Sequence, residues 1–512
     1  MSKDEKKEEQ KSSALSRRNF LGMTAGTAAA FTIVPRHVLG GAGYQAPSEM
    51  INVAGIGVGA QGGGDIQRIS DPDVPIQRPQ RTQTGQPFTP EQIAEQEAQQ
   101  AARMAAMQQQ GGQQRQQPPQ GFQMPEREPV HLANIYALCD VDSQYAGYIF
   151  AGYPKAKIYT DYRRMLDNEK EIDAIVIGTP DHNHAHIAAY AMKMGKHVYC
   201  EKPLCKTIYE ARKLAEIAKE MDVVTQMGNQ GHASEDARLI NEWIADGAIG
   251  LVREVWCWTN RPTWPQGDIP RPAGVPVPGH IDWDLWLGPA PEKAYNPDIC
   301  HFVWRGLRDY GTGALGDMGA HIFDHPFWAL NLGLPEKIQA SSTPYNDEYW
   351  PQGEIITYEF SARGYMPPVK LTWVDGGLTA PRPPELEDGR RLPTSGALYF
   401  GDKGVLMHSD YGGSPRLIPE TAMEAYERPD PWMERSPGIH AEWIEAIKNG
   451  KKSSTDFSYS SRLVETMMLG NVAVLMANRN TTLEYDAVNM KFTNLPEADD
   501  LLHYEYRKGW AL

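Results

Sequence analysis

Short apolar runs alternate with helix-forming stretches along the first half of the chain. The expected strands are Glu49–Ile56, Ala133–Leu138, Asp173–Ile177, His197–Cys200 and Val223–Met227, and the expected helices are Ile187–Lys193 and Ile208–Met221. Apolar runs of this length, bounded by turn residues, are typical of strands buried on both faces. Because helices separate them, the pattern predicts an α/β region built on a doubly wound parallel sheet.

The pattern changes after Gly250, where apolar and polar residues alternate one by one. This alternation is typical of antiparallel strands that bury one face. It occurs over Leu251–Thr259, Lys337–Ser342, Glu354–Ser361, Val369–Val374 and Gly396–Phe400. A hairpin turn is expected at residues 401–404, and two amphipathic helices, Ile439–Lys448 and Ser461–Ala477, should return to pack on the sheet or on the first half. The second half is therefore predicted to be α+β, a mainly antiparallel open sheet with helices.

The first strand runs directly into a glycine-rich turn, residues 57–62, which reads G-V-G-A-Q-G. In such a turn the first glycine permits the tight bend, the second lets backbone amides approach a pyrophosphate, and the third lets the next helix pack closely. The helix N-terminus adds free N–H groups and the positive end of its dipole. The motif predicts a Rossmann dinucleotide site formed by Gly57, Gly59, Gln61 and Gly62.

An acidic residue is expected about 20 residues beyond that turn. The next strand that ends in an acid ends at Asp140, 78 residues after Gly62. Between them lies a stretch in which 16 of the 46 residues from 75 to 120 are glutamine, a composition that does not build a core. Removing residues 71–130 brings Asp140 to 18 positions after Gly62, so we interpret these residues as a surface insertion.

Asp140 is expected to accept hydrogen bonds from the hydroxyls of an adenosine ribose. A carboxylate about 4 Å from a 2′-phosphate would cost roughly 1–4 kcal/mol. The acid therefore favours NAD over NADP as the cofactor.

The N-terminal region carries an export pattern. Residues 16–21 read Ser-Arg-Arg-Asn-Phe-Leu, which matches a twin-arginine signal, and a mildly apolar run follows as far as Val34. We expect recognition by the twin-arginine machinery and a periplasmic or otherwise exported location, with the signal either removed or kept as an anchor. The predicted organisation is a signal region over 1–42, an NAD-binding domain over 49–230 and a substrate-binding and oligomerisation domain over 231–512.

Composition excludes several classes of function. The net charge is −15, and about −18 without the first forty residues, which carry seven basic and four acidic side chains. So acidic a surface repels phosphate backbones, which argues against nucleic-acid binding. The five cysteines are odd in number and contain no CxxC pair, which fits neither a disulfide framework nor a zinc ribbon.

Three further motifs name a family. Glu201-Lys202-Pro203 directly follows a strand, Thr179-Pro180 is followed by His184, and the glycine-rich residues 311–321 end in Asp317-x-x-x-His321. Together with the glycine turn, they resemble the glucose–fructose oxidoreductase and inositol dehydrogenase (Gfo/Idh/MocA) family. The resemblance covers about residues 50–512. The chain departs from the family in its glutamine-rich insertion and in a Pro- and Trp-rich segment, Arg261–Pro291, which leaves the substrate and the oligomer contacts open.

The resemblance implies roles on the cofactor side. Lys202 would lie between nicotinamide and substrate, and Pro203, with a cis bond before it as one possibility, would shape the turn that aims it. Glu201 and the Thr179-Pro180 turn would line the cofactor site, and His184 would pack near the nicotinamide.

On the substrate side, Asp317 and His321 are four residues apart and share one helix face, so the carboxylate is expected to hold the imidazole beside a substrate hydroxyl. A histidine suits general-base duty, and a lysine could stabilise a developing alkoxide. The sequence leaves open whether Lys202 or His321 takes the proton.

Other candidates for substrate contact are His232, which follows the last parallel strand, and Trp304, Arg305 and Tyr310. A metal site is a rival hypothesis, because His182, His184 and His186 cluster and His321 and His325 are one turn apart. We expect no metal, since the family motifs explain His321 without one.

The most direct interpretation is an NAD-dependent oxidoreductase that transfers a hydride between nicotinamide and a sugar, glycoside or polyol carbon. A second is an NAD-dependent glycoside hydrolase that oxidises a ring carbon transiently, eliminates the leaving group, adds water and restores the hydride. A third is a non-catalytic binding scaffold. A small sugar or polyol partner and a homodimer or homotetramer are expected for the first two.

Overall fold

The structure is a computed structural model that describes residues 50–77, 79 and 130–512. The predicted twin-arginine signal and most of the glutamine-rich insertion lie outside the described residues. Among the described residues, no helix combines the length and the apolar character needed to cross a bilayer. The five cysteines are all free and buried.

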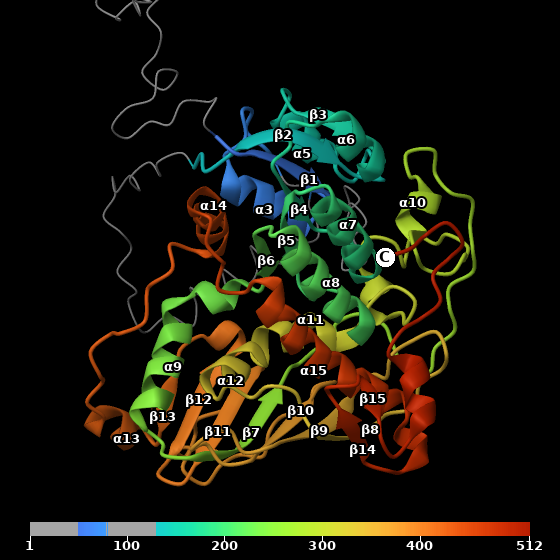
Figure 1. The fold of residues 1–512 in the computed structure, drawn as a ribbon. Helices are drawn as coiled ribbons and strands as arrows, with labels where there is room; N and C mark the ends of the chain where they lie inside the picture. Colours follow the sequence, from blue (N-terminus) through green and yellow to red (C-terminus); the bar gives the residue numbers. More distant parts are fainter. Residues whose placement is uncertain (1–49, 78, 80–129) are drawn as a thin grey trace, which may run out of the picture. The chain divides into compact units, whose positions relative to one another are not determined.

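The first half forms a six-stranded parallel sheet in the order β3-β2-β1-β4-β5-β6 (Figure 1). The strands are β1 (Asn52–Ile56), β2 (Asn134–Cys139), β3 (Lys157–Tyr159), β4 (Ala174–Ile177), β5 (His197–Glu201) and β6 (Thr225–Gly228). The helices are α3 (Gln61–Ile69), α5 (Gly147–Gly152), α6 (Tyr162–Asn168), α7 (Asp181–Lys193) and α8 (Ile208–Met221). Strand order reverses between β1 and β4, so the carboxyl ends of these strands open a crevice there. The predicted doubly wound Rossmann sheet is confirmed.

Local sequence explains helix α8, whose predicted bounds are the observed ones. The Thr207 hydroxyl accepts a hydrogen bond from the Glu210 amide, and the Glu210 carboxylate accepts one from the Thr207 amide. Together they form a capping box. The helix ends at Asp222 in a left-handed conformation (φ 51°).

The two ends of the predicted insertion meet at one point of the fold. The Asp71 amide donates to the Val130 carbonyl oxygen, and the Val130 amide donates to Asp71 Oδ2, both at 2.7 Å. The first residues of the predicted insertion still pack against the first half. The amide of Val74 donates to the Gly152 carbonyl oxygen, and the Ile76 side chain packs against Gly152.

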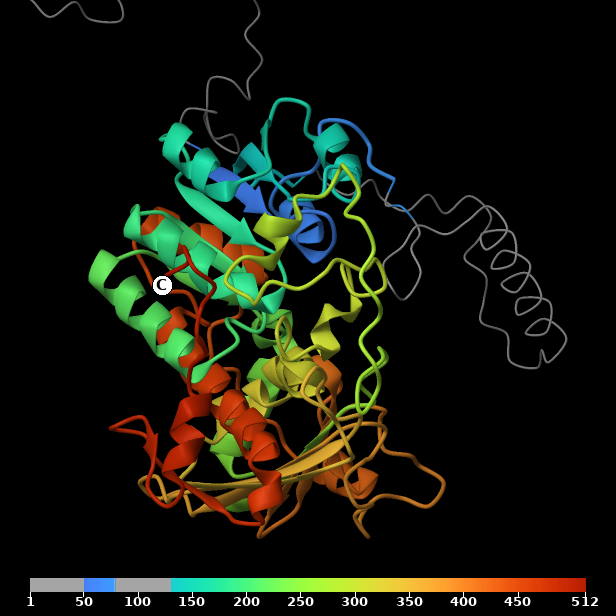
Figure 2. The same cartoon turned by 90° about the vertical axis from the view of Figure 1, so that its right-hand side faces the viewer.

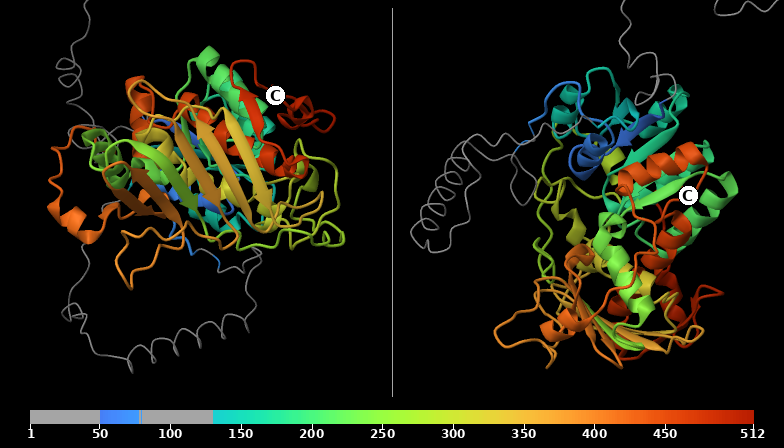
Figure 3. Two further views of the ribbon diagram at one scale, coloured as in Figure 1. Left: turned by 90° about the horizontal axis from the view of Figure 1, so that it is seen from below. Right: turned by 90° about the vertical axis from the view of Figure 1, so that its left-hand side faces the viewer.

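The second half forms a nine-stranded sheet in the order β13-β12-β11-β7-β10-β9-β8-β14-β15. The strands are β7 (Val252–Trp258), β8 (Lys337–Ser342), β9 (Glu354–Phe360), β10 (Val369–Val374), β11 (Gly396–Gly401), β12 (Val405–Ser409), β13 (Arg416–Ile418), β14 (Leu483–Asp486) and β15 (Lys491–Phe492). All its pairs are antiparallel except β7 with β10, so the predicted mainly antiparallel sheet is confirmed. Figure 3 (left) shows one face of this sheet without covering helices. That the sheet serves as an oligomer surface stays a prediction.

Helices of the second half cover the other face of this sheet or pack against the first half, and they join the two halves. They are α9 (Glu235–Asp246), α11 (Gly313–Ile322), α12 (Asp324–Ala329), α13 (Glu420–Ala425), α14 (Ile439–Asn449) and α15 (Phe457–Leu475). As expected from the sequence, the last two return to the first half. His440 on α14 reaches Asp65 on α3, and Glu465 on α15 pairs with Arg212 on α8.

Residues 261–310, here called the roof segment, connect the second sheet to the edge of the first sheet (Figure 2). They contain α10 (Trp283–Leu287) and the 3-10 helix η3 (Val303–Gly306). Their aromatic side chains form a separate apolar cluster that includes Trp264, Trp286 and Trp304. The Pro- and Trp-rich stretch is therefore an ordered, packed part of the fold.

Candidate active site

A cavity lies at the carboxyl ends of β1, β2, β4 and β5. Its walls come from the loops after these strands, from α11, and from the roof segment. The residues that line it include Gly57, Gly59, Gln61, Asp140, Asp142, Tyr145, Thr179, Pro180, Glu201, Lys202, Trp286, His301, Trp304, Arg305, Asp317, His321 and Tyr411. The crevice thus brings most of the candidates from both halves of the sequence to one place.

The glycine turn packs against its neighbours more closely than side chains would allow. Gly57 has φ 76°, and a Cβ there would lie 2.7 Å from the backbone nitrogen of Thr179. A Cβ on Gly62 would lie 2.5 Å from the Gly57 carbonyl oxygen, so only glycine lets α3 approach the strand this closely. This cradle fits a dinucleotide pyrophosphate against the N-terminus of α3.

Asp140 lies beside that cradle at the end of β2. Its Oδ2 accepts from the Gly59 amide and its Oδ1 from the Asp142 amide, both at 2.9 Å. Burial raises the pKa of Asp140 to about 6, although the two amide hydrogen bonds oppose this. The carboxylate therefore shapes the glycine turn directly, in addition to the ribose contact expected from the sequence.

The turn that carries Lys202 is held by buried groups. The bond between Lys202 and Pro203 is cis. The His184 ring lies between two carbonyl oxygens, with Nδ1 2.8 Å from that of Pro203 and Nε2 2.8 Å from that of Thr179. His184 and Pro203 thus lie behind the cavity, where they support its wall, while Thr179 and Pro180 line it.

Helix α11 is tied to the same wall. Asp181 Oδ2 accepts from both the amide and the hydroxyl of Thr312, the residue before α11, at 3.1 and 2.7 Å. This contact sets the position of Asp317 and His321 relative to the loop after β4.

Lys202 and Asp317 form an ion pair inside the cavity. Lys202 Nζ donates to Asp317 Oδ1 at 2.8 Å and to the Asp317 main-chain oxygen at 2.9 Å. Arg305 Nε lies 3.6 Å from the same Oδ1. Burial by itself would raise the pKa of Asp317, but the charges of Lys202 and Arg305 outweigh it and hold that pKa far below its usual range.

His321 does not form the expected hydrogen bond with Asp317 among the described contacts. The carboxylate pairs instead with the Lys202 ammonium, since a full charge attracts it more strongly than a neutral imidazole does. Burial and the nearby Lys202 charge hold the pKa of His321 well below its usual value, so the ring is neutral. Its Nδ1 is enclosed without a partner, and its ring lies 4.3 Å, centroid to centroid, from that of Tyr411.

Glu201 reaches a second buried acid. It accepts from the Gln230 side chain at 3.0 Å and lies next to Asp65 of α3, which in turn contacts His440 Nε2 at 3.1 Å. Burial, and for Glu201 also the charge of Asp65, raises the pKa of Asp65 to about 7 and that of Glu201 to about 8.

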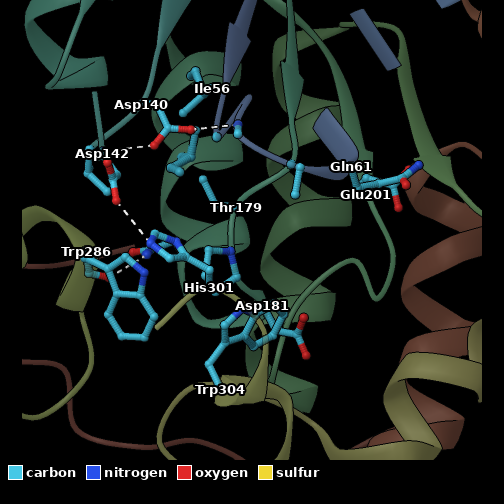
Figure 4. A pocket seen from close by; sticks show the side chains of 18 of the residues that line it. Ile56, Gln61, Asp140, Asp142, Thr179, Asp181, Glu201, Trp286, His301 and Trp304 are labelled. Atoms are coloured by element: carbon cyan, nitrogen blue, oxygen red, sulfur yellow. Dashed lines mark hydrogen bonds and ion pairs between the residues drawn. The ribbon is translucent and has the colours of Figure 1, made fainter. Parts of the chain in front are cut away.

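The roof segment is attached to the loop after β2, next to Asp140 (Figure 4). Asp142 Oδ1 lies 2.8 Å from His280 Nδ1, and its Oδ2 lies 3.0 Å from His301 Nε2. The His301 ring stacks on Tyr145 with 3.8 Å between centroids and 5° between planes. Main-chain hydrogen bonds from Asp282 to Val141 and from Ser143 to His280 complete the attachment.

Two of the substrate candidates lie elsewhere. His232 is buried, and its Nδ1 lies 2.9 Å from Asp324 Oδ2. Its ring stacks on Trp328, so Asp324 occupies Nδ1 and Trp328 covers one face of the ring. Tyr310 is buried within the roof segment, where its hydroxyl accepts from Arg271. The expectation that these two contact substrate is not met by this geometry, whereas Trp304 and Arg305 do line the cavity.

The cavity also contains residues that the sequence did not single out. Asp142 follows Asp140 in a D-x-D pattern at a strand end, a signal that was available. Tyr411 and His301 come from distant loops, and nothing in their sequence neighbourhoods marks them. Within the described parts of the chain, no three His, Cys, Asp or Glu side chains are arranged to hold a metal ion.

Comparison with known families matches both halves. The Gfo/Idh/MocA model described as an oxidoreductase family with an NAD-binding Rossmann fold matches residues 98–229. The model of that family's C-terminal alpha/beta domain matches residues 263–349.

Individual relatives agree with these matches. The chain is 23% identical over 349 residues to the uncharacterized oxidoreductase YdgJ of Escherichia coli, which covers 65% of this chain and 86% of YdgJ. It is 28% identical over 166 residues to levoglucosan dehydrogenase of Pseudarthrobacter phenanthrenivorans, and this match spans only 34% of that enzyme. The solved WlbA dehydrogenase of Bordetella pertussis, in complex with NADH and UDP-GlcNAcA, shares the fold with a TM-score of 0.50 at 15% identity, over 85% of this chain and 99% of that chain.

Proposed function

Because the chain belongs to the Gfo/Idh/MocA family of NAD-binding oxidoreductases, we propose that it oxidises a hydroxyl-bearing carbon of a sugar, glycoside or polyol. The observation that carries the proposal is the meeting of Lys202, Asp317 and His321 in one cavity with the glycine cradle. Bound NAD would supply the hydride acceptor. The relative named levoglucosan dehydrogenase supports a sugar-like substrate, and the membership sets aside the non-catalytic scaffold.

The cofactor would be held by the first half of the chain. The Gly57–Gly62 turn and the N-terminus of α3 suit the pyrophosphate, and Asp140 suits the adenosine ribose. Thr179, Pro180 and Glu201 line the cavity on the side of Lys202, where the nicotinamide would lie.

Lys202 would stabilise negative charge on the substrate oxygen. An ammonium has three donors, and two of them are engaged by Asp317, which leaves one for the substrate. A preorganised cation beside a developing alkoxide lowers the barrier, because the cation needs no rearrangement during the reaction.

His321 would accept the hydroxyl proton. Its imidazole is neutral, and its Nδ1 is enclosed, so Nε2 is the nitrogen left to face a ligand. Lys202 is already paired with a carboxylate as a cation, which suits it less well to removing a proton. The geometry therefore supports His321 as the general base and Lys202 as the electrostatic partner.

A redox-neutral variant is the second candidate, and the roof segment is what favours it. His301 and Tyr145 line the cavity beside Asp140, where the adenosine would lie, and the contacts of Asp142 with His280 and His301 hold the roof segment there. This attachment would slow release of the cofactor. An enzyme that keeps its cofactor suits a reaction that starts and ends in the same oxidation state, such as glycoside cleavage through a transient ketone. Export, predicted from the twin-arginine motif, would add to the need to retain NAD.

The experiment is a comparison of Lys202→Met with wild type on a panel of sugars, polyols and nitrophenyl glycosides. Turnover of the variant should fall by about 10²- to 10⁴-fold, while the affinity for NAD, measured by titration, changes little. Lys213→Met, on the exposed side of α8, is the matched control and should behave as wild type. Equal losses of turnover and NAD affinity would assign Lys202 to cofactor binding instead.

The same panel separates the two candidates. Net appearance of reduced nicotinamide indicates the dehydrogenase, and release of nitrophenol without it indicates the redox-neutral cleavage.

A further inference from the structure

Tyr411 enters the cavity from a part of the chain that carries none of the family motifs. It lies in the 3-10 turn η4 (Asp410–Gly412), which follows β12 in the second sheet. Its ring lines the cavity and is tilted by 47° against the ring of His321. Lys202 and Asp317 lie close enough to act on it electrostatically.

The backbone of Tyr411 adopts a conformation that side chains disfavour. Its φ and ψ are 56° and 19°, in the left-handed region that glycine enters without cost. The loop has no freedom to follow another path, because a Cβ on Gly231 would lie 2.7 Å from the Tyr411 carbonyl oxygen. A Cβ on Gly412 would likewise lie 2.5 Å from the His325 ring. A glycine at position 411 would relieve this strain, yet the chain has a tyrosine there.

Burial does not explain the tyrosine. The side chain is 42% exposed, in contrast to the fully buried aromatic residues that form the core. Its hydroxyl has no hydrogen-bond partner among the described residues. A strained residue that presents an exposed ring beside reactive side chains indicates a function rather than packing.

We propose that Tyr411 is the platform on which the substrate ring rests, and that it makes the enzyme prefer cyclic sugars or cyclitols to open-chain polyols. The inference rests on the proposed function. A pyranose or cyclitol has an apolar C–H face and a polar rim of hydroxyls. The flat face of the Tyr411 ring matches the apolar C–H face of such a substrate, while Lys202 and His321 contact one of the hydroxyls on its rim. An open-chain polyol has no such flat face, so it gains little from the ring. Tyr411 is thus a positioning residue that selects the shape of the substrate.

The test measures binding and turnover in Tyr411→Gly, which keeps the backbone conformation and removes the ring. The probes are myo-inositol and methyl β-D-glucopyranoside, which are cyclic, and D-sorbitol, which is not. Binding to the NADH-loaded protein is followed by the fluorescence of the bound nicotinamide, so that the measurement does not depend on turnover. Tyr411→Phe keeps the ring, and Ser414→Gly, at another left-handed position of the same loop (φ 52°), is the matched control.

We expect Tyr411→Gly to weaken binding of the cyclic probes by about ten-fold or more. KM should rise in proportion wherever turnover is measurable, with a smaller effect on kcat. Sorbitol binding should change little, and Tyr411→Phe and Ser414→Gly should stay near wild type.

Two results would overturn the platform while leaving the proposed function in place. One is Tyr411→Gly binding the cyclic probes as tightly as wild type does, and the other is equal weakening for cyclic and open-chain probes. If the NADH-loaded wild type binds none of the three compounds, the proposed substrate class fails and the platform fails with it.

Discussion

The two walls of the cavity are built in different ways. The floor consists of the glycine turn and the loops at the ends of β1, β2, β4 and β5, and close backbone packing holds it together. The roof consists of residues 261–310, and side chains that are distant in sequence attach it to the floor, above all Asp142 with His280 and His301. The difference teaches that the proposed cofactor cradle depends on local backbone geometry, whereas the enclosure of the cavity depends on long-range pairs.

The largest effect is expected from breaking the floor with Gly62→Val. Its Cβ would lie 2.5 Å from the Gly57 carbonyl oxygen, so α3 must move away from the strand. NAD affinity should fall by about ten-fold or more, and the free energy of unfolding should fall by about 1–3 kcal/mol. Titration with NAD and thermal unfolding check both.

The matched control for this variant is Gly64→Ala in the same helix. There the nearest atom to a new Cβ is the end of the flexible Arg68 side chain, at 3.4 Å. Alanine is the better helix former by about 1 kcal/mol, so this variant should keep NAD affinity and gain some stability. A loss of affinity in Gly64→Ala equal to that in Gly62→Val would contradict the role assigned to close packing.

An intermediate effect is expected from loosening the roof with Asp142→Asn. The variant removes the charge that pairs with His280 and His301, while the amide oxygen still accepts from the amides of Gln144 and Tyr145. Dissociation of bound NAD should quicken by about ten-fold, as expected when one partner of a buried polar contact is weakened, with little change in the fold.

Exchange of bound NAD for a fluorescent analogue measures this rate. Asp268→Asn, an exposed residue of the same roof segment, should exchange at the wild-type rate. Unchanged exchange in Asp142→Asn would show that the roof does not retain the cofactor, and would remove the support for the redox-neutral candidate.

The smallest effect is expected from the acid pair beneath the floor. Burial first of all raises the pKa of Asp65 to about 7 and of Glu201 to about 8, above the values of an unfolded chain. Each carboxyl therefore stabilises the fold fully below its unfolded pKa, and this contribution is lost as the pH rises through about 7 to 8. The melting temperature should fall as the pH rises from about 5 to about 8 and then level off, and Asp65→Asn, which can still bond His440, should make the fall shallower. The measurement is thermal unfolding from about pH 5 to about pH 9; an equally steep fall in both proteins would argue that other groups are responsible.

Much of the fold could be predicted, because the order of apolar and polar residues within short segments indicates most of its helices and strands. The bounds of α8, β8 and β10 are those read from the sequence, since a capping box or strict alternation marks them. Short elements such as β3 and β15 were not predicted, because a segment of two or three residues is too short to show a periodic pattern. The parallel pairing of β7 with β10 could not be predicted either, since the alternation of apolar and polar residues does not indicate the relative direction of two strands.

The sequence motifs predicted several of the residues that line the candidate site, but they did not predict which of these residues contact one another. Lys202, Asp317 and His321 do line one cavity, but the expected partner of Asp317 was wrong, because an ammonium from another motif occupies the carboxylate. His232 follows a strand end, yet it is buried, paired with Asp324 and stacked on Trp328.

By itself the sequence determined the Rossmann sheet, the glycine cradle, the acid at the end of β2 and the order of the family motifs. All of these are set by residues near one another in the chain, where backbone sterics and periodicity act. Only the tertiary structure decided that Lys202 pairs with Asp317, that the roof segment attaches to Asp142, and that Tyr411 faces the cavity. Those contacts join residues that are 90 or more positions apart, and their energy depends on charge and shape complementarity that exists only after folding.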